Sequence, residues 1–362
     1  MACQEGGALL IKILLAQVLP PADECDALLS TQSVWDWHFQ DVLHLPTRER
    51  EEWKKACHEE LESLRARRVF ELTDLPKGRK VIKNRWVFDI KQDGRKKARL
   101  VAKGFSQVEG IDFNEIFSPV VRFETVRLML ALSSLEDWHI EVLDVKTAFL
   151  YGKLDKEIYM HQPEGFKLKG QENKVLRLHH ALYGLKQAAL SWWRELEASM
   201  KRFGFRCMRS DASVFLTKHG GQLVIAVVYV DNALFFRKNL EAVKKVKKTF
   251  MDIWECQDLG KAREFLRMKI WCEGKKIFLD QTNYLKMVVE CFGMTNAKGA
   301  ITPLPAGYVP VKSKEQCTPE FRTTYQSIIG SLLYIMLGTC PNITYTVTKL
   351  AQFSANPSKE HI

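Results

Sequence analysis

Two predicted strands, far apart in the chain, each lead into a carboxylate. In the first, residues 138–145 alternate so that Ile140, Val142 and Asp144 point to the same face of a strand. An unpaired carboxylate is expensive to bury, so Asp144 needs a cap, a charged partner or a metal ion. For Asp144 on its own, a hydrogen-bonded cap is the simplest interpretation.

The second carboxylate, Asp231, lies between two apolar runs. Residues 223–230 predict a buried strand, Asp231 and Asn232 predict a turn, and residues 233–236 predict the returning strand. Asp and Asn are common turn residues, so turn chemistry alone would explain this pair. If the fold brings Asp144 and Asp231 together across 231 − 144 = 87 residues, they supply the two carboxylates that two-metal nucleotidyl transfer requires.

Positive charge is concentrated in one stretch of the chain. The 362 residues include 54 Lys and Arg against 43 Asp and Glu, a net charge of +11. Residues 77–103 hold eleven basic and two acidic residues, so they carry 11 − 2 = +9. Their pattern predicts a hairpin that turns at 92–94. The returning strand then places Lys97, Arg99 and Lys103 on one face, which favours a phosphate backbone as partner, with a solvated surface as the alternative.

Apolar residues recur every three to four positions in several other segments, which predicts helices. These helices are expected at 47–69, 124–133, 189–203, 240–250, 325–337 and 343–353. The helix that stops at Gly204 is expected to bury Ala189, Trp193, Leu196, Met200 and Phe203. The helix at 240–250 is expected to expose Lys244, Lys245, Lys247 and Lys248. The prolines of 302–312 predict a linker.

Composition narrows the class of protein. Hydrophobic residues make up 46% of the chain, enough for a sizeable core. We find no run of the roughly 18 apolar residues that a membrane span needs, and Lys12 interrupts the apolar residues 8–19, which makes a poor signal peptide. Nine cysteines without metal-ligand spacing predict free thiols. We therefore expect a protein of the cytoplasm or nucleus with no membrane partner.

An ordered series of short motifs runs through most of the chain. The motifs are residues 97–107, 117–122, 143–150, 159–166, 182–187, 229–232, 258–260, 292–294 and 330–334. In this order they resemble the reverse transcriptase domain of copia-type LTR retrotransposons, a part of their Pol polyproteins. The resemblance extends from about Trp53 to His361. A single Tyr-x-Asp-x motif would be weak evidence, but the ordered set is strong.

The resemblance implies an α+β fold of the right-hand polymerase type. It implies an antiparallel palm sheet with helices, fingers that include the hairpin at 81–103, and a partial thumb and connection. Residues 46–300 would form the fingers, the palm and the start of the thumb. Residues 301–362 would form a linker and a helical connection segment, truncated before ribonuclease H. Residues 1–45 match nothing and are a poorly defined N-terminal segment.

The same resemblance implies a catalytic group. Asp144, Asp231 and Asn232 would be its catalytic residues, and Asp144 and Asp231 would bind Mg²⁺, with Mn²⁺ as an alternative. The implied activity is RNA-directed DNA polymerase, a nucleotidyl transfer by the two-metal mechanism. Its partners would be an RNA or DNA template with a primer, and deoxynucleoside triphosphates. A hydrolase using the same carboxylates is disfavoured, because no cluster of His or Glu accompanies them in the sequence.

The resemblance also implies residues that contact substrates. They are Lys97, Arg99, Lys103, Phe149, Tyr183 and Gly184. The basic residues would contact triphosphate or template phosphates. Phe149 matches the bulky residue that excludes a ribose 2′-hydroxyl, and a core aromatic is its alternative. Tyr183 and Gly184 would border the nucleotide, with Gly184 permitting a close approach of the backbone.

Four motifs depart from the family pattern. Asn232 replaces the second acid of Tyr-Val-Asp-Asp, which keeps an oxygen ligand but loses a charge worth several kcal/mol at about 4 Å from a cation. Ala189 stands at a usual Pro, Arg267 at the usual Gly of Phe-Leu-Gly-Met, and residues 340–342 read Cys-Pro-Asn in place of Arg-Pro-Asp. Two functions therefore stay open: a polymerase of impaired activity, or a catalytically dead, domesticated or decayed remnant that binds nucleic acid.

Overall fold

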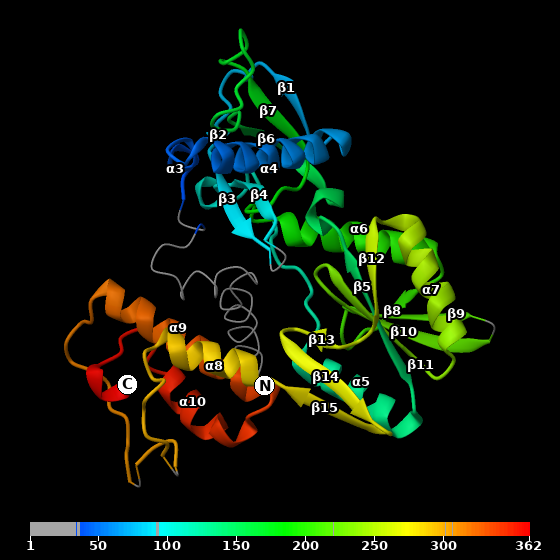
Figure 1. Ribbon diagram of the computed structural model, residues 1–362, viewed down its shortest axis with the longest axis vertical. Coiled ribbons are helices and arrows are strands. Elements are labelled where there is room, and N and C mark those ends of the chain that lie inside the picture. Colours follow the sequence, from blue (N-terminus) through cyan, green and yellow to red (C-terminus); the bar gives the residue numbers. More distant parts are fainter. Residues whose placement is uncertain (1–33, 35–36, 92–93, 220, 301, 306) are drawn as a thin grey trace. The chain divides into compact units, whose positions relative to one another are not determined.

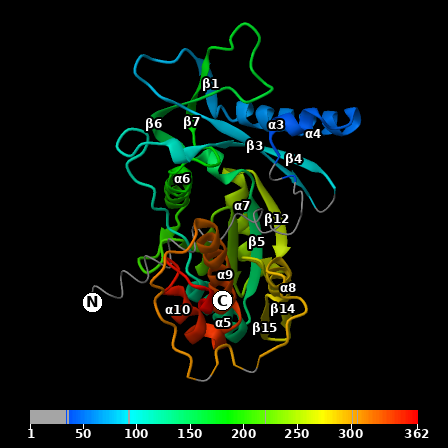
Figure 2. The same cartoon turned by 90° about the vertical axis from the view of Figure 1, so that its left-hand side faces the viewer.

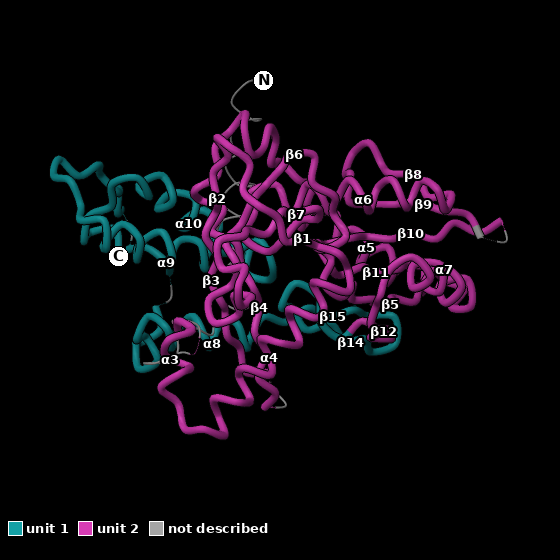
Figure 3. The backbone as a smooth tube through the Cα atoms, turned by 90° about the horizontal axis from the view of Figure 1, so that it is seen from above, with its two compact units in different colours: residues 1–33, 263–362 teal, residues 34–262 magenta. Residues whose placement is uncertain are grey.

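The computed structural model describes residues 34, 37–91, 94–219, 221–300, 302–305 and 307–362. These residues form two compact units, Val34–Ala262 and Arg263–Ile362, shown in magenta and teal in Figure 3. We call them the N-terminal and C-terminal units. Most of the predicted segment 1–45 lies outside the described residues, and its last part forms the short helix α3 (Phe39–Leu43).

A long helix covers a β-hairpin in the N-terminal unit. The three elements are α4 (Thr47–Ala66), β3 (Asn84–Ile90) and β4 (Lys96–Ala102). The strands pair antiparallel as predicted, with Phe88 opposite Ala98. Helix α4 lies along β4 (Figures 1 and 2), and Trp53 packs edge-on against Phe88 with ring centroids 5.2 Å apart. The helix predicted at 47–69 is confirmed, and the apolar residues that recur every three to four positions along it are all buried: Trp53, Cys57, Leu61 and Leu64.

A four-stranded sheet shares its core with this hairpin. Its strands, in spatial order, are β1 (Phe70–Thr73), β7 (Val175–His180), β6 (Lys153–Met160) and β2 (Val81–Ile82). Only the pairing of β2 with β6 is parallel among these neighbours. Met160 and Leu178 of the sheet belong to the same buried cluster as Trp53 and Leu100. The hairpin is therefore anchored through its apolar face, which leaves its basic face outside the core.

A six-stranded antiparallel sheet forms the rest of the N-terminal unit. Its spatial order is β12 (Cys256–Lys261), β5 (His139–Val145), β11 (Asn232–Arg237), β10 (Gln222–Tyr229), β9 (Val214–His219) and β8 (Arg206–Cys207). The associated helices are α5 (Phe123–Glu136), α6 (Ala188–Arg202) and α7 (Leu240–Ile253). Trp192 of α6 and Phe250 of α7 share a core with Leu143 and Phe235 of the sheet, and α5 contacts β11. Cover on both faces explains why β10 and β11 are almost continuously apolar.

The predicted stripe of α6 is wrong by one residue at its start. Ala188 and Trp192 are buried, whereas Trp193 is only partly buried and Phe203 is 46% exposed. The helix does stop before Gly204, as predicted. Trp192 faces the sheet because its indole reaches the turn after β10, a contact that no pattern within the helix reveals.

The prediction that Lys247 faces solvent is also wrong. Its side chain is 3% exposed, and its Nζ lies 2.8 Å from Glu141 Oε2 and 2.5 Å from Asp258 Oδ1. These carboxylates come from β5 and β12, so they neutralise a lysine that the helical pattern assigns to the polar face. Lys244, Lys245 and Lys248 are exposed as predicted.

The C-terminal unit contains a small sheet and three helices. Its elements are β13 (Glu264–Phe265), β14 (Met268–Glu273), β15 (Lys276–Asp280), α8 (Thr282–Cys291), α9 (Pro319–Gly338) and α10 (Thr344–Ala351). Helices α9 and α10 confirm the two predicted near the C-terminus, and Tyr325, Ile329 and Val347 form their common core. The described residues of 302–312 form neither helix nor strand.

The described residues bear on two expectations from composition, the state of the cysteines and the presence of a membrane span. The cysteines among them are free thiols, as predicted: Cys57, Cys207, Cys256, Cys272, Cys291, Cys317 and Cys340. No helix in the described part of the chain has both the length and the apolar character needed to cross a membrane.

Candidate active site

Strand register brings the two predicted carboxylates together at one end of the six-stranded sheet. Strands β5 and β11 pair antiparallel with Asp144 directly opposite Asn232, so these two side chains share a face. The next residue of β5, Val145, donates its N–H to the carbonyl of Asp231 over 2.7 Å. Asp144 and Asp231, 87 residues apart, are thus held on adjacent backbone segments.

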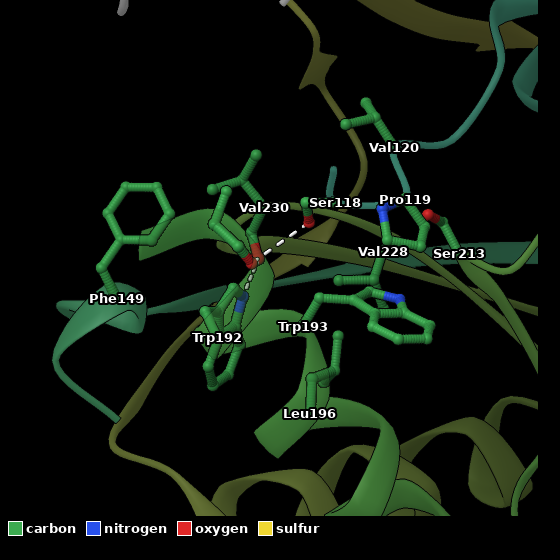
Figure 4. Close-up of a pocket in the computed structure, with 11 residues that line it drawn as sticks. Ser118, Pro119, Val120, Phe149, Trp192, Trp193, Leu196, Ser213, Val228 and Val230 are labelled. Atoms are coloured by element: carbon green, nitrogen blue, oxygen red, sulfur yellow. Dashed lines mark hydrogen bonds between the residues drawn. The ribbon is translucent and has the colours of Figure 1, made fainter. Parts of the chain in front are cut away.

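The turn between β10 and β11 differs from the prediction. Tyr229 pairs with Asn232, so the two turn residues are Val230 and Asp231, and Asn232 belongs to the strand. Val230 has φ +54°, a conformation that a β-branched residue rarely adopts. The indole N–H of Trp192 donates to the carbonyl of Val230 over 2.6 Å (Figure 4). This hydrogen bond and the strand pair hold a strained turn at the point where Asp231 is presented.

Burial and mutual repulsion set the protonation of the two carboxylates. Burial, and then the charge of Asp144, raises the pKa of Asp231 to about 6, although a 2.9 Å hydrogen bond from Asn232 Nδ2 to Asp231 Oδ1 opposes the rise. Burial also raises the pKa of Asp144, against the opposing effect of Lys97, Lys146 and Lys91. Two partly dehydrated carboxylates that destabilise each other form a site that a cation would stabilise.

The basic hairpin β3–β4 extends toward this carboxylate pair. The charge of Lys97 acts on Asp144 and that of Arg99 acts on Asp231, in both cases lowering the carboxyl pKa. A guanidinium nitrogen of Arg99 also lies 3.6 Å from the Oδ2 atom of Asp89, which belongs to β3. Lys103 follows the end of β4, and its N–H donates to the carbonyl of Lys83 over 2.8 Å. The structure therefore places Lys97 and Arg99 within electrostatic range of the carboxylates, and shows no such effect of Lys103.

An aromatic pair borders the same region. Phe149 lies in the 3-10 turn Ala148–Tyr151, and its ring meets that of Tyr183 edge-on, with centroids 5.6 Å apart and planes at 82°. Both residues are half-buried. Burial raises the pKa of the Tyr183 hydroxyl, and the charge of Glu60 adds to that rise. Tyr183 is therefore a neutral aromatic at physiological pH.

Gly184 allows a close approach, and the partner is the hairpin itself. It has φ +84°, and a Cβ there would lie 2.2 Å from the carbonyl oxygen of Ala102. A Cβ on Gly104 would lie 2.1 Å from the carbonyl oxygen of Gly184. The N–H of Ala102 donates to the carbonyl of Tyr183 over 2.8 Å. These contacts fix the end of β4 against the loop that carries Tyr183.

A small cavity of about 40 Å³ lies beside the Val230 turn (Figure 4). The sequence prediction did not include Ser118, Pro119 or Trp192, which line it together with Phe149. Ser118 Oγ donates to the carbonyl of Ala189 over 3.1 Å. The available signal was the motif at 117–122, which the resemblance contained without assigning it a role.

The ligands available at the carboxylate pair decide which metal ion could bind there. The described residues contain no group of three His, Cys, Asp or Glu side chains arranged for a metal ion. Asp144 and Asp231 nevertheless form a partly buried like-charge pair, and their oxygen donors suit Mg²⁺. Mg²⁺ typically takes one or two carboxylates and completes its shell with water and substrate phosphates, so two carboxylates fit this ion.

Residues 67–306 match a family model described as "Reverse transcriptase (RNA-dependent DNA polymerase)". The chain belongs to this family. It is 41% identical to the "Retrovirus-related Pol polyprotein from transposon TNT 1-94" of Nicotiana tabacum, over 89% of this chain and 25% of that protein. It is 34% identical to the corresponding polyprotein from transposon RE1 of Arabidopsis thaliana, over 86% of this chain and 22% of that protein.

A third relative confirms the copia-type relationship. The putative transposon Ty5-1 protein of Saccharomyces cerevisiae is 30% identical, over 61% of this chain and 71% of its own length. The chain spans only about a quarter of the plant polyproteins. Among solved structures, a foamy viral protease–reverse transcriptase in complex with double-stranded DNA overlaps 88% of this chain and 47% of that chain, with 13% identity and a TM-score of 0.43.

Proposed function

We propose that this chain is an RNA-directed DNA polymerase domain that extends a primer on an RNA or DNA template. The observation that carries the proposal is the register of β5 and β11, which sets Asp144 opposite Asn232 and next to Asp231. The raised pKa of Asp231 supports it, because two partly dehydrated carboxylates that repel each other would be stabilised by a bound cation. Membership of the reverse transcriptase family agrees with this chemistry.

In this proposal the six-stranded sheet is the palm and the hairpin β3–β4 belongs to the fingers. Residues 46–300 would comprise the fingers, the palm and the start of the thumb, and residues 301–362 a linker and connection segment. The support is the position of the carboxylates on the sheet and the influence of Lys97 and Arg99, both on the hairpin, on their pKa values. A protein of this kind would act in the cytoplasm or nucleus, where its template and nucleotides are found.

Asp144 and Asp231, with the amide oxygen of Asn232, would hold Mg²⁺ or Mn²⁺. When bound, the ions would activate the primer 3′-hydroxyl and neutralise the triphosphate and the leaving pyrophosphate. Asn232 offers an oxygen without charge, and in the described structure its amide instead donates to Asp231. Metal affinity should therefore be lower than with a third carboxylate, and activity correspondingly impaired.

The remaining residues of the site would orient the substrates. Lys97 and Arg99, and Lys103 at the end of the same strand, would bind triphosphate or template phosphates. Phe149 would exclude a ribose 2′-hydroxyl, and Tyr183 supports its ring from the side. Gly184 would border the nucleotide while its backbone keeps the end of β4 in contact with this loop.

Primer extension tests the proposal. The parent protein should extend oligo(dT) on poly(rA) slowly with Mg²⁺ and faster with Mn²⁺, which accepts less regular coordination. Asn232→Asp restores the missing charge in nearly the same volume and should raise the rate at least tenfold, equivalent to about 1.4 kcal/mol of barrier. Asp144→Asn should abolish extension in both backgrounds. Extension that survives Asp144→Asn would refute the assigned site.

Two residues that depart from the family motifs favour a second function. Asn232 lacks the family's charge, and Arg267 occupies a positive-φ position, φ +56°, where the family has Gly. Both changes fit a catalytically dead, domesticated or decayed protein that still binds nucleic acid. If Asn232→Asp binds primer–template yet gives no extension with either metal, this second function is the correct one.

A further inference from the structure

Phe105 is an aromatic side chain placed in solvent by a rigid turn. It lies in the 3-10 turn Gly104–Ser106, which is separated from the end of β4 by Lys103 alone. It is 81% exposed, the highest fraction among the large apolar residues of the described chain. Single exposed apolar residues are ordinary, so exposure alone does not indicate a role. What distinguishes Phe105 is that close contacts hold the backbone on both sides of it.

Both sides of the turn are fixed by contacts. Before Phe105, Gly104 is packed closely on Gly184: a Cβ on Gly104 would lie 2.1 Å from the carbonyl oxygen of Gly184. After Phe105, the side chain of Gln107 is buried: its Oε1 accepts from the N–H of Lys186 at 2.8 Å, and its Nε2 donates to Gln187 Oε1 at 3.0 Å. Ser106 Oγ also donates to the carbonyl of Lys103 over 2.8 Å. The backbone that presents the exposed ring is therefore held in place from both sides.

The location of the turn indicates the partner. Phe105 follows Lys103, the last basic residue of the +9 stretch at 77–103. Its neighbour Gly104 touches Gly184, beside the Tyr183 ring that meets Phe149. Further along the chain, the carboxylate of Asp112 accepts a hydrogen bond from the N–H of Val108 at 2.8 Å, so this acidic group is already engaged. The turn that carries the ring therefore joins the end of the basic hairpin to the loop proposed to border the nucleotide.

We propose that Phe105 is a stacking platform for an unpaired base of the template strand. This inference rests on the proposed function, since it assigns a binding residue to the template of that site. Exposed aromatic rings beside a basic groove are how proteins bind single-stranded nucleic acid without reading its sequence, because every base has a π face. A second copy of the chain is the competing occupant. The adjacent basic strand favours a polyanion over a cationic copy of the same protein.

Binding measurements test the inference without requiring catalysis. Fluorescence anisotropy would compare a blunt RNA–DNA hybrid with the same hybrid extended by a five-nucleotide single-stranded template overhang, at one fixed salt concentration. The parent should bind the overhang hybrid more tightly. Phe105→Ala should bind the overhang hybrid about tenfold more weakly, within the range for one stacked base, and keep its affinity for the blunt hybrid. Phe105→Trp should retain the overhang preference, and Phe105→Leu should abolish it.

An abasic nucleotide identifies the stacked position. Placing it at each overhang position in turn should, at one position, reduce parent affinity about as much as Phe105→Ala does, with no further reduction in the variant. Leu135→Ala is the matched control, because Leu135 is 75% exposed on α5 and should not affect either hybrid.

Each contrary result has a distinct meaning. Equal parent affinity for the two hybrids, or an overhang preference that survives Phe105→Ala or Phe105→Leu, overturns the stacking role and leaves the proposed polymerase intact. If the parent self-associates and Phe105→Ala abolishes this, the ring belongs to a protein interface and the inference is overturned. Failure of the parent to bind either hybrid would refute the proposed function itself, and the inference with it.

Discussion

Asp231 is held in a conformation and an environment that suit function better than stability. Its turn partner Val230 has φ +54°, and its partly buried carboxyl group is repelled by Asp144. Strain and like-charge burial each reduce the free energy of unfolding, and proteins retain them mainly at functional sites. Neutralising this carboxylate should therefore stabilise the metal-free protein.

The sign of the pH dependence follows from the pKa of Asp231. The folded-state pKa is about 6, above the ordinary value of 3.8, so folding favours the protonated form. The contribution of this group to stability is fully present below about pH 3.8 and is lost as the pH rises through about 6. Asp231→Asn should therefore melt at a higher temperature than the parent at pH 7.5 in EDTA, and the difference should shrink toward pH 4.5.

Thermal unfolding from pH 4.5 to 8 measures this effect. Asp252→Asn, which removes an exposed carboxylate of α7, should give no comparable pH-dependent gain. Mg²⁺ should raise the melting temperature of the parent at pH 7.5 and have little effect on Asp231→Asn, because ligand binding stabilises only a fold that binds it. A melting difference that grows toward acid pH would contradict the assigned environment of Asp231.

At the scale of elements, the turn between β13 and β14 shows a local conflict. Phe265 pairs with Met268, so the two turn residues are Leu266 and Arg267, with φ +51° and +56°. Two-residue hairpins with positive φ at both positions favour Asn-Gly, and a left-handed non-glycine residue costs roughly 1–2 kcal/mol. The hydroxyl of Tyr334 donates to the carbonyl of Leu266 and so helps to hold the turn.

Arg267→Gly should therefore increase the stability of the protein. Glycine relieves the strain but loses more chain entropy on folding, so the net gain should be about 1 kcal/mol. Urea unfolding followed by circular dichroism measures it. Lys269→Gly, on an exposed position of β14, is the matched control and should be destabilised by roughly 0.5–1 kcal/mol. A less stable Arg267→Gly protein would show that interactions of the arginine outweigh the strain.

Helix α7 is joined to the six-stranded sheet by an ion triad centred on a buried lysine. Lys247, with a side chain 3% exposed, joins Glu141 of β5 and Asp258 of β12. Lys247→Met leaves two carboxylates without their cation, so we expect destabilisation by about 3 kcal/mol, the lower end for a broken buried pair because Asp258 is 46% exposed. Lys248→Met, one position further on the exposed face, should change stability by about 0.5 kcal/mol or less.

Urea denaturation of both lysine variants makes the comparison. Adding Glu141→Gln to Lys247→Met should recover part of the stability, because it removes one of the two uncompensated charges. Equal effects of Lys247→Met and Lys248→Met would mean that the triad contributes nothing to the fold.

Helices and strands with a clear hydrophobic periodicity were predictable from the sequence, whereas the elements they pair or pack with were not. Alternation in 138–145 and 84–102 indicated β5 and the hairpin, and the apolar residues of that alternation, such as Ile140, Trp86 and Phe88, are buried. The pairing of Asp144 with Asn232 depends on strand register across almost ninety residues, which no local pattern contains. The same limit explains the errors at Lys247 and at the Val230–Asp231 turn: burial of the lysine is set by β5 and β12, and the turn is set by the pairing of Tyr229 with Asn232.

In the candidate site, too, single residues were predictable from local motifs, whereas contacts between distant segments were not. Local motifs identified Asp144, Asp231 and Phe149, whose roles stay predictions. The close approach of Gly104 to Gly184 and the hydrogen bond from Trp192 to Val230 join segments about 40 to 80 residues apart, so only the folded chain reveals them. Ion pairing also modifies the basic stretch: Lys96 lies 3.0 Å from Glu52 and Lys91 lies 3.0 Å from Asp89.

For the whole molecule, net charge and local charge give different expectations for nucleic acid binding. The net charge of +11 would attract a polyanion to any basic surface, whereas the hairpin concentrates cations near the carboxylate pair. Counterion release separates the two, because each cation that no longer neutralises a duplex phosphate reduces the steepness of log K against log salt by about 0.9. Replacing Lys97, Arg99 and Lys103 with Ala removes three charges from the hairpin.

We expect this triple variant to reduce the steepness of that plot by roughly one to two units in primer–template binding. The reduction should fall short of three full phosphate neutralisations because Arg99 is already close to Asp89. The matched control is Lys244, Lys245 and Lys248 to Ala, which removes the same charge from the exposed face of α7. Salt titrations monitored by fluorescence anisotropy give both slopes. If binding is local to the hairpin, only the first variant changes the slope. Equal changes in both would mean that net charge drives association and that the hairpin is only a solvated face.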